Sequence, residues 1–94
     1  MAFADEQSYE EMIAALQNFL TELEEQCTVI ETAGTDCVDN TDNDPAATKS
    51  NEKLKNVVTK IRATFDKVQG IITALEEELD DIRVAAQKAD EMDD

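Results

Sequence analysis

The chain has 94 residues, with 23 acidic and eight basic side chains, no histidine and a net charge of −15. This length allows one small domain, 1–94. The charge excludes nucleic acid and anionic membrane surfaces as partners, because both would repel it. No apolar run is long enough to span a membrane, and the first residues lack the basic and apolar regions of a signal peptide. Without histidine or a glycine-rich phosphate loop, the sequence predicts no enzyme activity, no cofactor and no metal site.

The first half of the chain predicts one long helix over residues 5–33. Ser8 followed by Glu11 matches the pattern of a capping box, so we expect the helix to begin at either Asp5 or Ser8. Apolar residues then recur at alternating steps of three and four, the spacing of a coiled-coil seam. We expect Gly34 to end this helix as its C′ residue. The alternative is a helix that continues, because Gly34 and Cys37 keep the seam spacing. The seam residues of the first helix are Ile13, Leu16, Leu20, Leu23, Cys27 and Ile30.

Residues 34–44 are the predicted loop, rich in Asp, Asn and Thr. Its oxygen-bearing residues match an EF-hand only in part, because Pro45 and Asn51 stand where that motif needs Gly and Glu, so we interpret it as a polar turn. Asp44 followed by Pro45 is a start signal, which predicts a second helix over residues 45–91. The seam residues of the second helix are Leu54, Val58, Ile61, Phe65, Val68, Ile72 and Leu75.

Two long helices with matching seams predict an all-α fold, an antiparallel helical hairpin with a coiled-coil-like seam. In such a hairpin a row of acids on the first helix comes opposite a row of bases on the second, which fixes the register. The acids are Glu22, Glu24 and Glu31, and the bases are Lys53, Lys60 and Arg62. A lone hairpin buries little apolar surface, and more apolar residues flank both seams. We therefore expect two hairpins to pair into a four-helix bundle, as an antiparallel homodimer or as a heterodimer. The flanking residues are Met12, Phe19, Val29, Val57, Ile71 and Val84.

The second helix is predicted to extend beyond the first, which leaves its C-terminal end without an intrachain partner. An amphipathic helix end of this kind fits a groove in another protein. The residues that we assign to this partner-recognition or export-recognition end are Glu76, Leu79, Ile82 and Ala86. Cys27 falls on the seam as a small core residue, and Cys37 falls in the loop. We expect reduced thiols at both, with a disulfide between chains as the alternative.

A chain of this length without a signal peptide, folded as a helical hairpin that pairs into a four-helix bundle, resembles the WXG100 (ESAT-6-like) superfamily. Where that family has Trp-x-Gly at its turn, this chain has Thr32-Ala33-Gly34, which keeps the glycine and lacks the tryptophan. The only tyrosine is Tyr9, so the family's C-terminal Tyr-x-x-x-Asp/Glu export signal has no match. The likeness is to a motif-poor branch, such as the small helical partners of larger type VII toxins.

The resemblance implies a non-enzymatic protein-interaction module that acts through helix–helix pairing. It would be a small type VII secretion substrate or toxin partner, secreted without a cleaved signal peptide, and would bind a second hairpin, the secretion machinery or a toxin. One alternative is a cytoplasmic structural or adaptor bundle from a phage or mobile element. Another is an acidic inhibitor that mimics nucleic acid, which the base-free first half of the chain motivates.

Overall fold

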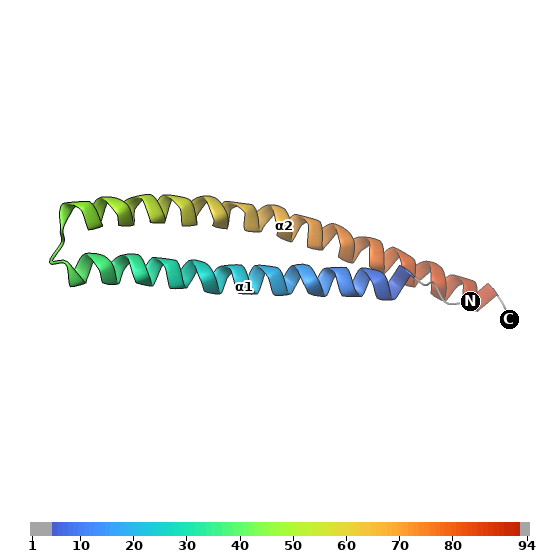
Figure 1. Ribbon diagram of the computed structural model, residues 1–94. Coiled ribbons are helices and arrows are strands. Elements are labelled where there is room, and N and C mark those ends of the chain that lie inside the picture. The colour runs from blue at the N-terminus through green and yellow to red at the C-terminus, as the bar shows by residue number, and fades with distance from the viewer. Residues whose placement is uncertain (1–4, 93–94) are drawn as a thin grey trace. The chain divides into compact units, whose positions relative to one another are not determined.

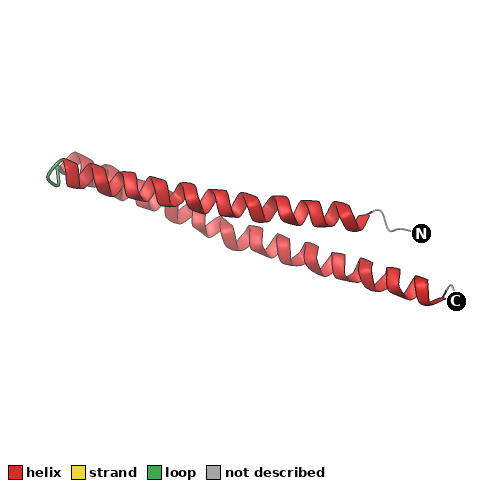
Figure 2. Ribbon diagram, turned by 90° about the horizontal axis from the view of Figure 1, so that it is seen from below, coloured by secondary structure: helices red, strands yellow, loops and turns green. Residues whose placement is uncertain are grey.

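The computed structural model describes residues 5–92, which form two α-helices joined by a short turn (Figure 1). Helix α1 spans Asp5–Asn40 and helix α2 spans Pro45–Met92. The described part of the chain contains no strand (Figure 2). The all-α helical hairpin that the sequence predicts is therefore confirmed.

The two helices build two compact units, each of which we describe by itself. The turn unit is Leu20–Lys67, with the second half of α1, the turn and the first half of α2. The terminal unit consists of residues 5–19 of α1 and residues 68–92 of α2. Within each unit, a stretch of α1 lies beside a stretch of α2 that runs in the opposite direction (Figure 1).

Helix α1 ends at Asn40, so the expected end near Gly34 is wrong and the alternative of a longer helix is correct. The stop is a Schellman motif, in which the Asn43 N–H donates to the Val38 carbonyl at 2.9 Å and the Asp42 N–H donates to the Asp39 carbonyl at 3.3 Å. Asp42 and Asn43 have positive φ angles of 52° and 61°. Asp and Asn tolerate this left-handed conformation better than other non-glycine residues, so Asp42 takes the C′ position that we gave to Gly34.

Helix α2 begins at Pro45, as the Asp-Pro signal predicts. The Asp44 carboxylate caps the helix, because its Oδ2 accepts hydrogen bonds from the backbone N–H groups of Ala46 and Ala47, each at 3.1 Å. Pro45 occupies the first helical position, where its missing N–H costs no intrahelical hydrogen bond. The turn is therefore only residues 41–44, much shorter than the loop expected over residues 34–44.

The core of the turn unit follows the predicted seam. Cys27 on α1 and Val58 on α2 are almost completely buried. The half-buried seam residues of this unit are Leu20, Leu23, Ile30, Ile61 and Phe65. Leu54 differs from the expectation, because its side chain is 40% exposed. It lies beside Gly34, and a glycine has no side chain with which to cover it.

The core of the terminal unit follows the seam as well. Ile13 on α1 and Ile72 and Leu79 on α2 are buried. The half-buried seam residues of this unit are Leu16, Val68 and Leu75. The cores of the two units, taken together, contain only five buried apolar side chains among the described residues. Most of the other large apolar side chains that the structure describes are half-buried or exposed.

Candidate interaction surface

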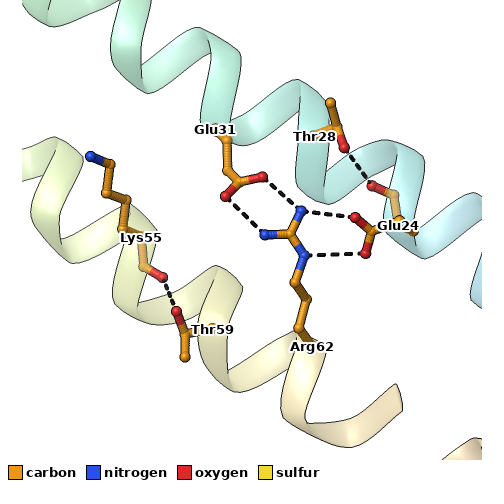
Figure 3. A network of polar contacts seen from close by, with 6 residues as sticks. All are labelled: Glu24, Thr28, Glu31, Lys55, Thr59 and Arg62. Atoms are coloured by element: carbon orange, nitrogen blue, oxygen red, sulfur yellow. Dashed lines mark hydrogen bonds and ion pairs between the residues drawn. The ribbon is translucent and has the colours of Figure 1, made fainter. Parts of the chain in front are cut away.

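One edge of the turn unit is fixed by Arg62 of α2, which reaches two glutamates of α1 (Figure 3). Its guanidinium binds the Glu31 carboxylate through two hydrogen bonds of 2.8 and 2.7 Å, and the Glu24 carboxylate through two of 3.1 and 2.9 Å. Both contacts are bidentate, the strongest geometry for this pair of groups. Hydrogen bonds from Arg62 lower the pKa of the Glu31 carboxyl, and those to Glu31 and Glu24 raise the pKa of Arg62.

The terminal unit has a charged edge of the same kind. Arg83 of α2 donates from Nε to Glu6 at 2.8 Å and from a terminal nitrogen to Glu10 at 2.6 Å. These hydrogen bonds raise the pKa of Arg83. Ion pairs between α1 and α2 thus form in both units, and both use arginine. The expected pairing of acids with Lys53 and Lys60 is not what the structure has, since Arg62 alone takes up both Glu24 and Glu31.

The other edge of the turn unit is apolar. On α2, Arg62 follows the buried Val58 by four residues and Val57 precedes it by one, so at 100° per residue they lie on opposite sides of the core position. The ion pairs place Arg62, Glu24 and Glu31 on one edge, so Val57 lies on the other. Its side chain is 51% exposed. On α1, Val29 precedes the half-buried Ile30 by one residue, on the side away from Glu31, which follows it, and Val29 is exposed too.

Charged residues border this apolar edge in two separate rows. Lys53, Lys60 and Lys67 are exposed and follow one another at intervals of seven along α2, which places them on a single line of the helix. No ion pair among residues 5–92 involves these three lysines. Glu22 and Asp36 hold the equivalent line on α1 and are exposed as well. We call this surface the Val57 face. Its members are Val29, Leu54 and Val57, bordered by Glu22, Asp36, Lys53, Lys60 and Lys67.

The terminal unit also exposes large apolar side chains. Met12 and Phe19 each precede a seam residue of α1, and Ile71 precedes the buried Ile72 of α2. They stand on the edge away from Arg83 by the same periodicity. Here, however, the bordering residues of α2 include the acids Glu78 and Asp81. All six residues that the sequence placed beside the seams are exposed in the structure, among them Val84.

The predicted recognition end of α2 has an intrachain partner, so our expectation of an unpartnered segment is wrong. Leu79 is buried in the terminal unit, Ile82 and Ala86 are half-buried, and only Glu76 is exposed. Arg83, in the middle of this segment, binds Glu6 and Glu10 of α1. The reason is the length of α1, whose first turn reaches Arg83. Ala89 and the residues after it up to Met92 are exposed.

Gly34 and Asn51 make a close contact that the sequence did not predict. Asn51 is buried in the core of the turn unit, and its Oδ1 has no hydrogen-bond partner. A Cβ at position 34 would lie 3.1 Å from its Cγ and nearer still to its Oδ1. The absence of a side chain at Gly34 therefore makes room for the Asn51 amide. The signal was present, because Asn51 precedes Leu54 by three residues and keeps the seam spacing.

Neither cysteine forms a disulfide; Cys27 is buried in the core, as its seam position predicts, and Cys37 is exposed on α1. Residues 5–92 hold no group of three or more His, Cys, Asp or Glu side chains able to bind a metal ion. Over the same range, neither helix contains a stretch apolar and long enough to cross a membrane. Comparison with known protein families, with characterised proteins and with solved structures finds no match.

Proposed function

We propose that this chain is a non-enzymatic interaction module that binds another helical protein through its exposed apolar side chains. The observation that carries the proposal is the contrast between neighbouring positions on one helix. Ile72 is completely buried while Ile71 beside it is 53% exposed, and Val58 is buried while Val57 is exposed. Apolar residues repeated at this offset broaden a coiled-coil seam into the wider stripe of a four-helix bundle.

The ion pairs support the same proposal from the other side of each unit. Arg62 and Arg83 are engaged within the chain, so the charged edges hold α1 against α2. The apolar edges take no part in those ion pairs and remain accessible. A surface divided in this way has one edge for the intrachain register and one for a partner.

In its more specific form, we propose a small substrate or helical partner of a type VII secretion system, exported without a cleaved signal peptide. This form rests on the likeness to the WXG100 superfamily in length and helix order. Gly34 lies within α1 rather than at the turn, so it does not occupy the position of the family's turn glycine. A structural or adaptor bundle inside the cell would use the same apolar surface and is the competing form of the proposal.

The experiment is site-specific photo-crosslinking in cells that produce the protein. A photoreactive residue replaces Val57 in one variant and Val84 in the control. Val84 is a valine of similar exposure on α2, but at 100° per residue it lies on the side of the helix away from the exposed Ile71. We expect a crosslinked product of discrete mass from position 57 and none from position 84. Products of equal yield from both positions, or from neither, would overturn the proposal. A crosslinked product found in the culture medium would support the secreted form of the proposal. A product found only inside the cells would support the adaptor.

A further inference from the structure

We infer that the partner of the Val57 face is a second copy of this chain, packed with its turn at the same end, so that α1 of each copy lies against α2 of the other. This inference rests on the proposed function and names its partner. The antiparallel homodimer expected from the sequence uses the same subunits in a different orientation, and the charges of the Val57 face favour one orientation over the other.

The distribution of charge makes the turn unit the place for self-association. Leu20–Lys67 holds ten acids and six bases, whereas the rest of the chain holds 13 acids and two bases. Two copies that met through the apolar residues of the terminal unit would bring Glu78 and Asp81 toward more acids. The Val57 face has three lysines against two acids, so its charges nearly cancel and a second copy meets little like-charge repulsion there.

The two rows of charge are self-complementary in only one of the two face-to-face arrangements. A two-fold axis perpendicular to the helices sets α1 against α1 and α2 against α2, which places acids near acids and lysines near lysines. A two-fold axis parallel to the helices sets α1 against α2 of the other copy. Each lysine row then faces an acidic row, twice in the dimer.

The register of that contact follows from contacts within the chain. Arg62 binds Glu24 and Glu31, so residue 62 of α2 stands level with residues 27 and 28 of α1. Because the two helices are antiparallel, each step forward along α2 corresponds to one step back along α1. Lys67, five residues after Arg62, therefore stands level with Glu22. Lys53, nine residues before Arg62, stands level with Asp36. An axis parallel to the helices keeps these levels between copies. Lys67 therefore faces Glu22 of the second copy, and Lys53 faces its Asp36.

The area is adequate for a stable pair. The α2 part of the turn unit, residues 45–67, is about 34 Å long at 1.5 Å per residue, and two adjacent helices are about 20 Å wide. A face of those dimensions covers about 700 Å² on each copy, or about 1,400 Å² in total, which falls within the range of about 1,200–2,000 Å² typical of specific interfaces. Val29, Leu54 and Val57 supply its apolar centre.

A charge exchange tests the inference. Variant E22K/D36K makes the α1 row basic and variant K53E/K60E/K67E makes the α2 row acidic. We expect each variant alone to self-associate at least about tenfold more weakly than the parent, because like charges then face each other. Mixed in equal amounts, the two variants should form a heterodimer, since the facing pairs of charged positions, 67 with 22 and 53 with 36, again have opposite signs. The matched control is E25K/D39K, with the same change of charge three residues further along α1, which should remain a dimer.

Circular dichroism establishes that each variant is helical, and a salt titration of the unmodified protein gives a second readout. Attraction across the Val57 face predicts that the difference in self-association between the parent and each charge variant becomes smaller at high salt, because salt screens the charges of the face. Failure of the mixture to restore pairing would overturn the orientation, as would a difference that high salt leaves unchanged. A monomeric parent that still gives a crosslink at position 57 would overturn the second copy as partner and leave the proposed function standing. Loss of that crosslink would remove the proposed function itself.

Discussion

Replacing Gly34 with alanine places a methyl group where the Asn51 side chain now lies. The new Cβ would stand 3.1 Å from the Asn51 Cγ and 3.6 Å from the Leu54 Cδ1, and its approach to Oδ1 forces the amide to move. Overpacking of this kind costs about 1–3 kcal/mol. Alanine also gains about 1 kcal/mol over glycine within a helix, so we expect G34A to be destabilised by roughly 0–2 kcal/mol.

The effect of G34A on the stability of the protein changes sign when Asn51 is replaced by alanine. N51A removes the buried Oδ1 that has no hydrogen-bond partner, a group whose unsatisfied burial costs about 1–3 kcal/mol. In the N51A background the methyl at position 34 meets no amide, so G34A should stabilise the protein by about 1 kcal/mol. The two substitutions should therefore be coupled by about 1–3 kcal/mol.

The assay is urea unfolding followed by circular dichroism for the parent, both single variants and the double variant. All four are measured at one protein concentration, because the stability of a dimer depends on concentration. The control is Gly70→Ala, since an added Cβ at Gly70 meets nothing within 4 Å. It should stabilise both backgrounds by about 1 kcal/mol. Coupling between positions 34 and 51 below about 0.5 kcal/mol would refute the account of this contact.

Two further predictions concern the core and the charged edge. Ile72→Ala should destabilise the protein by about 2–5 kcal/mol, whereas Ile71→Ala, one residue away and 53% exposed, should change its unfolding free energy by less than about 0.5 kcal/mol in the monomer; equal losses would contradict the burial of the seam. Glu31→Gln should lower the thermal midpoint in a pH-dependent way. Because Arg62 lowers the pKa of folded Glu31 below its ordinary value of 4.5, the stabilisation is present above that value and disappears as the pH falls through the lowered pKa. Melting curves of parent and variant should differ most near neutral pH and converge in acid, and a gap that persists in acid would contradict the role of this ion pair.

Periodicity predicted the helices and most of their core, because burial along a coiled-coil seam is dictated by apolar spacing alone. The start of α2 at Asp44 and Pro45 was equally predictable, since capping uses a few residue types at fixed positions. The end of α1 could not be predicted in the same way. A left-handed C′ residue is most often glycine, and here Asp42 adopts that conformation while Gly34 remains helical.

The polar contacts were harder to predict than the seam. Asn51 keeps the seam spacing, but a polar side chain interrupts the apolar pattern by which a seam is recognised. Arg62 binds acids a full two turns of α1 apart, a reach that depends on the rotamer of a long side chain rather than on position. The burial of Leu79 depended on how far α1 extends toward the chain start, which the periodicity of α2 by itself does not encode.

The measurement that tests the central claim most directly is the solution mass of the reduced protein by light scattering, for the parent and for Val57→Asp. Pairing through the Val57 face predicts a parent mass near twice the chain mass of 10.4 kDa. The variant should fall toward the mass of a single chain, because pairing would remove a charged carboxylate from water among the apolar side chains at the centre of the face. A parent of 10.4 kDa at every concentration, or a variant that remains as dimeric as the parent, would contradict the account.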